Sequence, residues 1–394
     1  MRRRPPAADV LPGEPPIDSL RLARTDGVGP LTYRRLLARY GGAAAAIAAL
    51  PGLARDAGRT AAPTIPSPEE VAREQERLAR LGGRFLVLGQ PGYPPLLALL
   101  ADAPPVLACL GEPARLAGPA VALVGGRNAS ANGARVAEAL AADLAGAGLV
   151  VVSGLARGID AAAHTGALAT GRTVAAVAGG LDCPYPPEHA DLQRRIAETG
   201  VVLAEAPLGT APQARHFPRR NRVIAGLALG VIVVEAALRS GSLITARLAQ
   251  DAGREIFAVP GSPLDPRARG SNDLIRQGAH LTETAADVLE NLPDHPLRQG
   301  LARAPLFARA RADDPPEPPP HGCGDPVETD DLPPDVVAAA RTSVVRLLGP
   351  APTAVDDLLR RCQLSPAAVL AALLELELAG RIETLPGQRV ALLA

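Results

Sequence analysis

Residues 120–127 read Ala-Val-Ala-Leu-Val-Gly-Gly-Arg, a short apolar run that passes directly into a glycine-rich loop. Similar runs, rich in Val and Ile, recur through the middle of the chain, and helix-like segments separate them. The six runs occupy residues 121–124, 149–152, 173–177, 201–203, 231–234 and 255–259. Such runs are typical of a parallel sheet that is covered on both faces. We therefore predict an α/β fold with a Rossmann-like parallel sheet between two layers of helices.

Each run ends in a loop of small residues, and a parallel sheet places all of these loops along one side, which we call the carboxyl edge. The loops read Gly125-Gly126-Arg127, Ser153-Gly154-Leu155-Ala156-Arg157-Gly158, Gly179-Gly180, Glu205-Ala206-Pro207, Ser240-Gly241-Ser242 and Pro260-Gly261. Ligands of open α/β sheets bind outside the carboxyl ends of the strands. Free backbone N–H groups beside guanidinium groups favour an extended anion. The carboxyl edge is therefore predicted to hold phosphates.

Composition narrows the possible functions. The chain has 394 residues and a formal net charge of zero, so a nucleic-acid site must depend on local charge. All 41 basic residues are arginine, which excludes enzymes that need a lysine, such as P-loop NTPases and kinases. The four cysteines show no metal-ligand spacing, and reduced thiols are expected. No apolar stretch reaches the length of about 18 residues that a membrane span needs, and no signal sequence is evident, so we expect a cytoplasmic protein.

Two smaller units flank the predicted sheet. Residues 17–80 read as short helices joined by glycine turns, typical either of a helix-hairpin-helix that offers N–H groups to phosphates or of a plain packing module. Residues 313–335 are rich in Pro, Asp, Glu and Gly and are expected to be disordered. Residues 336–394 predict three helices and a hairpin, which together describe a winged helix. The third of these helices contains no arginine, so we expect it to contact protein rather than a DNA groove.

The usual catalytic patterns are weak. The loop after residue 124 lacks the dinucleotide-binding Gly-x-Gly-x-x-Gly pattern. Asp160 and His164 share a helix face, but no third metal ligand accompanies them, and we expect Asp160 to brace its loop and His164 to hydrogen-bond within the fold. Glu188 and His189 follow the rigid Tyr-Pro-Pro sequence at 185–187 and suit a helix's first turn. Catalysis is thus unsupported, and no cofactor or metal site is expected.

The strongest local signal lies in residues 213–222, which read Gln-Ala-Arg-His-Phe-Pro-Arg-Arg-Asn-Arg. Arginines around Phe217 supply phosphate pairing and base stacking, the two elements of single-strand recognition. The alternative is a solvated loop with Phe217 in the core. Cations are disfavoured at a helix N-terminus, however, and a bound anion would remove that penalty. The pattern therefore favours a nucleic-acid strand.

Several long motifs in order are similar to those of the DprA/Smf family. They are Ser-Gly-Leu-Ala-Arg-Gly-Ile-Asp at 153–160, Phe-Pro-Arg-Arg-Asn-Arg-Val-Ile-Ala-Gly at 217–226, Ser-Gly-Ser-Leu-Ile-Thr-Ala at 240–246, Phe-Ala-Val-Pro-Gly at 257–261 and Gly-Ser-Asn-Asp-Leu-Ile at 270–275. The resemblance spans residues 120–281. One departure is Gly126, where family members usually carry Ser or Thr.

The resemblance implies a non-enzymatic protein that binds single-stranded DNA during natural transformation. It implies a homodimer formed through the Rossmann-like domain, and loading of RecA onto strands despite single-strand-binding protein. It also implies four segments: a SAM- or helix-hairpin-helix-like domain at 1–80, the DNA-binding domain at 81–292, a linker at 293–335 and a winged helix at 336–394.

The expected site combines residues carried over by motif with their loop neighbours. The residues carried over by motif are Arg127, Ser153, Arg157, Phe217, Arg220, Asn221, Arg222, Ser240, Gly241 and Ser242. The neighbours are Gly125, Ser130, Gly154, Gly158, Arg215 and Arg219.

Two rival functions remain open. A nucleotide-processing enzyme, such as a phosphoribohydrolase, resembles this sheet but has Thr after its Gly-Gly loop and a nearby Glu, whereas Gly179-Gly180 is followed by Leu181-Asp182. A duplex-binding regulator would have to use the acidic third helix of the winged helix. Release of a free base would support the enzyme, and a footprint on duplex DNA would support the regulator.

Overall fold

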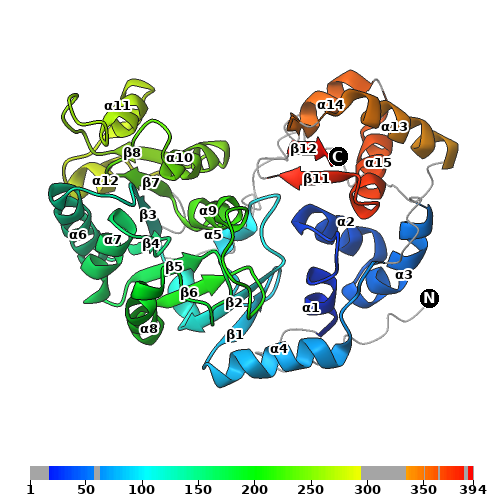
Figure 1. Cartoon of the computed structure of the whole chain (residues 1–394), viewed down its shortest axis with the longest axis horizontal. Helices are drawn as coiled ribbons and strands as arrows, with labels where there is room; N and C mark the ends of the chain where they lie inside the picture. Colours follow the sequence, from blue (N-terminus) through cyan, green and yellow to red (C-terminus); the bar gives the residue numbers. More distant parts are fainter. Residues whose placement is uncertain are drawn as a thin grey trace, which may run out of the picture.

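The computed structural model describes residues 17–56, 63–293, 334–349, 351–362, 364–385 and 389–393. It consists of a central sheet unit, an N-terminal helical unit and a C-terminal winged-helix unit (Figure 1). Residues 294–333 of the expected linker lie outside the described residues, as do residues 386–388 at the tip of the C-terminal hairpin. Pro334 and Asp335, which were expected to belong to the disordered linker, instead begin a helix.

The central unit contains one mixed sheet of nine strands. In chain order these are β1 (Arg84–Val87), β2 (Val106–Gly111), β3 (Ala120–Val124), β4 (Val150–Ser153), β5 (Thr173–Val177), β6 (Val201–Ala204), β7 (Gly230–Val233), β8 (Glu255–Ala258) and β9 (His280–Leu281). Across the sheet the order is β1-β2-β6-β5-β4-β3-β7-β8-β9. The six predicted runs all form strands that pair in parallel, which confirms the expected α/β architecture. Two strands, β1 and β2, extend the sheet antiparallel beyond β6.

Helices cover both faces of the sheet, as predicted, because alternate strand residues face opposite sides. Ala120, Ala122 and Val124 of β3 pack in one apolar cluster, and Val121 and Leu123 pack in another. The first face carries α5 (Pro95–Ala98), α9 (His216–Leu227) and α10 (Gly241–Asp251). The other carries α6 (Ala131–Gly146), α7 (Ile159–Leu168) and α12 (Ala285–Asn291). The remaining elements of the unit are η1 (Pro113–Ala117), η2 (Pro187–His189), α8 (Ala190–Thr199) and α11 (Arg269–Arg276).

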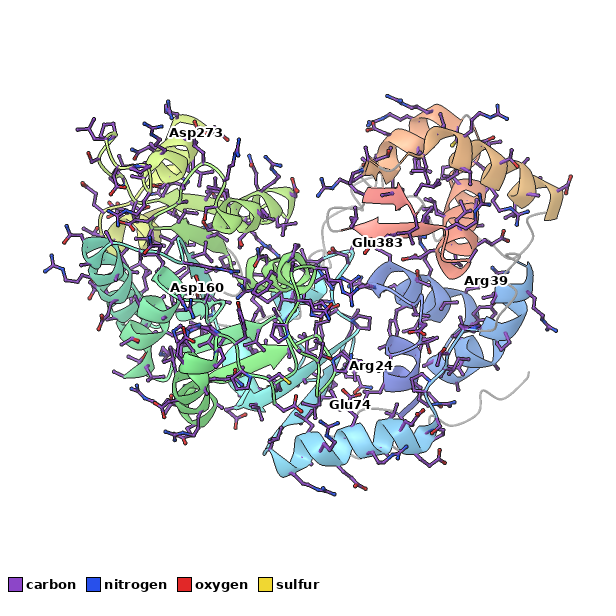
Figure 2. All side chains as sticks on the ribbon, viewed as in Figure 1. Arg24, Arg39, Glu74, Asp160, Asp273 and Glu383 are labelled. Carbon is purple, nitrogen blue, oxygen red and sulfur yellow. The ribbon has the colours of Figure 1, made fainter. Side chains whose placement is uncertain are left out.

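Four helices precede the sheet: α1 (Ile17–Ala23), α2 (Pro30–Tyr40), α3 (Ala43–Asp56) and α4 (Pro68–Arg80). Arg24 links this unit to the rest, because its guanidinium pairs with Glu74 of α4 and donates to the carbonyl oxygen of Glu205 (Figure 2). Arg34 of α2 donates to the carbonyl oxygens of Ala98 and Leu100, each at 2.8 Å. The helical unit is thus fastened to the sheet unit at more than one point.

The C-terminal unit has the predicted winged-helix pattern. Its elements are α13 (Pro334–Leu347), β10 (Thr353–Ala354), α14 (Val355–Cys362), α15 (Pro366–Leu378), β11 (Ile382–Leu385) and β12 (Arg389–Leu392). Its third helix, α15, packs on the N-terminal unit, where Leu374 joins a cluster that includes Tyr33 and Leu36. The two end units therefore lie side by side, as their blue and red ribbons show in Figure 1.

Among the described residues, no single helix has the length and hydropathy of a membrane span. One pair of helices, Pro30–Tyr40 and Ala43–Arg55, meets these two criteria only when counted together, and it is bent by 105°.

Candidate nucleic-acid interface

Part of the predicted site converges on one small pocket at the carboxyl edge. Strand β3 lies between β4 and β7, so the connections run outward from it in both directions and leave a crevice at its carboxyl end. The pocket has a volume of about 50 Å³. Its walls come from the loops after β3, β4 and β5 and from α9: Arg127, Gly154, Ala156, Arg157, Val177, Ala178, Gly179, Cys183, Tyr185, Pro186, Phe217 and Arg220.

Aromatic rings and an arginine form the outer part of this pocket. The guanidinium carbon of Arg127 lies 4.8 Å from the centroid of the Phe217 ring, within the range of a cation–π contact. Tyr185 meets Phe217 edge to face, with ring centroids 5.8 Å apart. Tyr185 is 46% exposed, so it presents apolar surface to solvent beside a cation. Base stacking on such rings is a common feature of single-strand binding.

The loop after β4 adopts a backbone that few residues permit. Leu155 has φ 58° and Gly158 has φ 74°. A Cβ on Gly158 would overlap the carbonyl oxygen of Gly126, so glycine is needed where this loop crosses the loop after β3. Arg157 projects from this loop with 64% of its side chain exposed, and it pairs with Glu188. Exposed ion pairs of this kind are weak, so Arg157 can exchange Glu188 for another anion.

Arg220 is a buried residue that lines the inner wall of the pocket. It is 7% exposed, and its guanidinium donates to the carbonyl oxygen of Gly154 and, at 3.2 Å, to that of Ala176. The carboxylate of Asp160 accepts from the Ala156 N–H at 3.3 Å, which confirms the expected bracing role. Burial raises the pKa of Asp160, and the neighbouring Arg220 opposes that rise; burial also lowers the pKa of Arg220. Arg220 and Asp160 together hold the loop after β4, through the carbonyl oxygen of Gly154 and the N–H of Ala156.

Other predicted site residues lie buried beside the pocket. Ser153 is fully buried and donates to the carbonyl oxygen of Leu123 at 2.6 Å. Arg222 pairs with Glu205 at 2.5 Å and donates to the carbonyl oxygen of Asp102. Their assignment as direct DNA contacts stays a prediction, and the geometry favours a positioning role for both.

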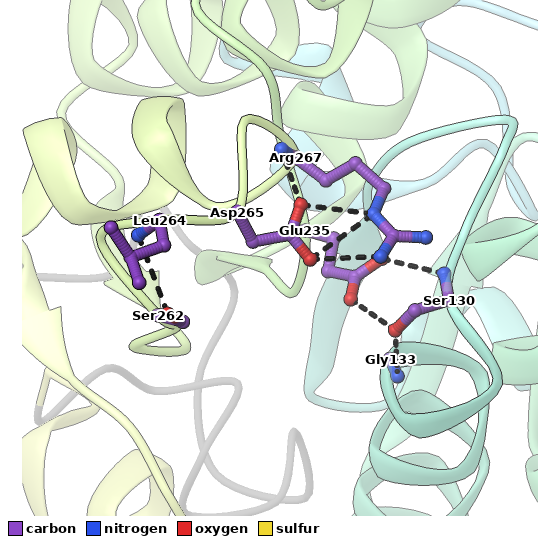
Figure 3. Close-up of polar contacts among 7 residues, drawn as sticks. All are labelled: Ser130, Gly133, Glu235, Ser262, Leu264, Asp265 and Arg267. Atoms are coloured by element: carbon purple, nitrogen blue, oxygen red, sulfur yellow. Dashed lines mark hydrogen bonds and ion pairs between the residues drawn. The ribbon is translucent and has the colours of Figure 1, made fainter.

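Ser130 also has partners within the fold (Figure 3). Its hydroxyl donates to Glu235 at 2.5 Å and accepts from the Gly133 N–H at 2.9 Å, so it caps α6. Gly125 packs against Ile159, where a Cβ would overlap that side chain. Both residues shape the loop that presents Arg127.

The rest of the predicted site extends along α9 and α10. Ser240 caps α10, with the Ser242 N–H donating to its hydroxyl at 3.4 Å, and Gly241 is exposed at the helix start. Asn221 joins the two helices through its side-chain amide, which donates to the carbonyl oxygen of Gly241 at 3.5 Å. Arg215 is exposed at the start of α9, whose first turn contains no acidic residue. Arg219 is exposed on α9 but lines a different cavity, described below.

The side chains considered for catalysis are engaged elsewhere in the fold. His164 is fully buried, its Nδ1 lies 2.7 Å from the Thr173 hydroxyl, and burial lowers its pKa to about 3. Asp182 pairs with Arg77 and accepts from the Gly209 N–H. Nδ1 of His189 lies 2.9 Å from the carbonyl oxygen of Leu155. Within the described ranges, no cluster of His, Cys, Asp and Glu could hold a metal ion.

Sequence reasoning did not include Tyr185 in the site. The sequence Tyr185-Pro186-Pro187 predicts a rigid turn, and Tyr185-Pro186 also belongs to the motifs shared with the DprA/Smf family, but neither interpretation gives the ring a binding role. The scarcity of aromatic residues, 2% of the chain, was the available signal, since an exposed ring in such a chain stands out.

Known proteins resemble this chain along most of its length. The profile described as DNA recombination-mediator protein A matches residues 84–293, a DprA-like N-terminal HHH domain matches residues 14–76, and a DprA winged helix domain matches residues 326–388. DNA processing protein DprA of Bacillus subtilis (strain 168) is 42% identical over 234 residues, which cover 59% of this chain and 77% of that protein. Protein Smf of Escherichia coli (strain K12) is 40% identical over 304 residues, 76% of this chain and 75% of that protein.

A solved structure supports the same relationship. The X-ray structure of DNA processing protein A (DprA) from Streptococcus pneumoniae superposes with a TM-score of 0.60 at 36% identity. The match covers 72% of this chain and all of that one. The chain belongs to the DprA/Smf family of DNA recombination mediators.

Proposed function

We propose that the carboxyl edge binds single-stranded DNA and that the protein acts as a recombination mediator. The observation that carries this proposal is the grouping of two exposed arginines, Arg127 and Arg157, around the rings of Tyr185 and Phe217. Guanidinium groups pair with phosphates, and exposed rings stack on bases of any identity. Binding should therefore weaken with salt and show little base preference.

The small volume of the pocket between Arg127 and Phe217 favours the binding of a nucleic-acid strand rather than of a small substrate. Sites that enclose small molecules usually measure about 300–1,000 Å³. The pocket between Arg127 and Phe217 measures about 50 Å³, so a nucleotide could place only part of itself inside. A strand that lies across the edge needs no deeper enclosure. The carboxylate of Asp182, which pairs with Arg77 and accepts from the Gly209 N–H, also argues against the nucleotide-processing alternative.

We extend the proposal to the partners expected of the family. The protein would load RecA onto single strands coated with single-strand-binding protein, act as a homodimer formed through the sheet unit, and catalyse no reaction itself. Family membership supports this part. RecA loading is tested by the rate at which RecA hydrolyses ATP on coated strands, and dimerisation by sedimentation.

The binding site is tested by fluorescence anisotropy with labelled oligo-dT and a matched duplex over a salt series. The variant Arg127→Ala/Arg157→Ala removes both exposed pocket arginines. The matched control is Arg172→Ala, because Arg172 is equally exposed but lies before β5, at the opposite edge of the sheet.

The unsubstituted protein and the Arg172 variant should prefer the single strand, and the double variant should bind it at least tenfold more weakly. The slope of log affinity against log salt should become shallower by about 1.4 in the double variant, for two lost phosphate contacts. Equal binding by all three proteins would refute the site, and release of a free base from a nucleotide would support the enzyme instead.

A further inference from the structure

The winged-helix unit is held firmly against the N-terminal helices. Leu374 of α15 is buried in their apolar cluster, and Glu377 is 8% exposed beside them. The Thr32 hydroxyl donates to the Glu377 carboxylate. Burial raises the pKa of Glu377, and the hydrogen bond from Thr32 and the charge of Arg35 oppose that rise. Because the N-terminal helices are themselves fastened to the sheet unit through Arg24 and Arg34, α15 has a fixed place relative to the sheet.

This placement brings the hairpin of the winged helix to α9. The Oε1 atom of Glu383 on β11 lies 3.5 Å from Nη2 of Arg219, and Figure 2 labels Glu383 on the hairpin. The two units face each other across a cavity of about 650 Å³. Arg219, Arg220 and Arg222 line one side of this cavity, and Glu377 and Glu383 line the other.

The two contacts of the winged-helix unit differ in strength. Its contact with the N-terminal helices is buried and combines the apolar packing of Leu374 with the hydrogen bond from Thr32 to Glu377. Its ion pair with Arg219 is exposed, because 56% of the arginine side chain and 46% of the glutamate side chain face solvent. Exposed pairs contribute little and are screened by salt. The hairpin can therefore separate from Arg219 at a small cost in free energy, while the docking of α15 keeps the hairpin close to α9.

Glu383 also holds its carboxylate where a nucleic-acid phosphate would be expected. Arg219 is in the first turn of α9, four residues from Arg215, and both are exposed. An anion is favoured at this helix start, and in the free protein Glu383 provides one. A strand that continued from Phe217 along α9 would meet Glu383 at Arg219.

We propose that the winged-helix unit is an internal competitor of single-stranded DNA, in which Glu383 occupies the phosphate position at Arg219 and a bound strand displaces it. This inference rests on the proposed function. Glu377 and Glu383 place two carboxylates of the C-terminal unit on the cavity that Arg219, Arg220 and Arg222 also line. Tethering makes the competition effective, because the carboxylate is present at a high local concentration.

The test compares oligo-dT binding by the unsubstituted protein, Glu383→Gln and the control Glu375→Gln. Glu375 lies on α15 but faces Arg341 of the same unit, so its removal changes net charge equally without freeing Arg219. Glu383→Gln should bind roughly threefold more tightly at low salt. Its salt slope should be steeper by about 0.7, for one added phosphate contact. Glu375→Gln should show neither change.

A second variant makes the inference refutable. In the Arg219→Ala background, Glu383→Gln should have no effect, because the arginine for which the carboxylate and the strand compete is absent. An unchanged affinity in Glu383→Gln overturns the competitor, and it leaves the binding site intact if Arg127→Ala/Arg157→Ala still loses affinity. If the unsubstituted protein does not bind the strand, both proposals fail.

Discussion

Helices α9 and α15 have similar lengths, 12 and 13 residues, but opposite charge. The first seven residues of α9 include Arg219, Arg220 and Arg222, and α15 contains no arginine and two glutamates. The first helix begins at the carboxyl edge, and the second packs on the chain's own N-terminal helices. The charge of each helix agrees with its partner, which is the proposed polyanion for α9 and the observed N-terminal helices for α15.

Within α9, charge alone does not decide which arginines reach solvent. Arg219 is largely exposed, whereas Arg220 and Arg222 are 7% and 4% exposed. Buried arginines are rare unless they are paired, and here Asp160 and Glu205 provide the partner charges. Helix α9 therefore carries both an exposed arginine that could bind the proposed strand and buried arginines that hold the loops of the carboxyl edge in place.

The largest expected effect comes from removing the buried cation with Arg220→Met. The variant should lose about 3 kcal/mol of unfolding free energy at pH 8, because Asp160 is left buried without its partner. Burial already raises the pKa of Asp160, and loss of the cation raises it further. A raised carboxyl pKa means that the folded state takes up a proton, so the deficit should shrink as the pH falls from 8 to 5. Urea unfolding monitored by circular dichroism measures both values.

Asp160→Asn/Arg220→Met provides the control for that measurement. Removing both charges should recover part of the lost stability and abolish the additional pH dependence. If the double variant were as unstable as Arg220→Met at pH 8, packing rather than charge would explain the loss, and the proposed role of Arg220 as an internal support would lack its electrostatic basis.

A smaller effect is expected on the α15 side of the comparison. Leu374→Ala should weaken the contact between the winged helix and the N-terminal helices by about 2 kcal/mol, since it leaves a cavity in their shared cluster. Hydrogen exchange of the α2 amides should accelerate by roughly thirtyfold. Leu373→Ala is the control, because Leu373 packs within the winged helix itself. Equal acceleration of α2 by both variants would mean that α15 is no docking helix.

The smallest effect should come from the exposed ring at the pocket. Tyr185→Ala should weaken oligo-dT binding by about 1 kcal/mol, or about fivefold, through loss of one stacking surface. Tyr185→Phe should bind like the unsubstituted protein, because stacking needs the ring and not the hydroxyl. An equal loss in both variants would instead assign the contribution to the hydroxyl.

The parallel core of the fold could be predicted because its signals are local. Runs such as residues 121–124 and 149–152, which consist of Val, Leu and Ala, precede glycine loops, and each overlaps a strand of the expected type. Strand β2 was not predicted, because Pro104 and Pro105 directly precede it and its partner β6 lies far along the chain. Its antiparallel pairing depends on that distant partner.

The sequence predicted which residue types form the site, but not which of their side chains reach the pocket and which are buried. The sequence indicated an arginine and aromatic cluster, and the structure brings Arg127, Arg157 and Phe217 to one pocket. The burial of Arg222 depends on Glu205 and on the carbonyl oxygen of Asp102, which are distant in sequence. The contact between Arg219 and Glu383 joins residues that are 164 positions apart. Such partners arise from tertiary packing, and helix periodicity carries no information about them.

The use of arginine alone at the carboxyl edge has a consequence for cellular control. Enzymes that acetylate or ubiquitinate lysine side chains find no lysine in this chain, so the charge of the edge cannot be removed in that way. Guanidinium groups also keep their proton throughout the physiological pH range. The positive charge of these arginines is therefore constant with respect to such enzymes and to pH, whereas ionic strength, guanidinium-directed modification or a competing carboxylate can alter its effect on a polyanion.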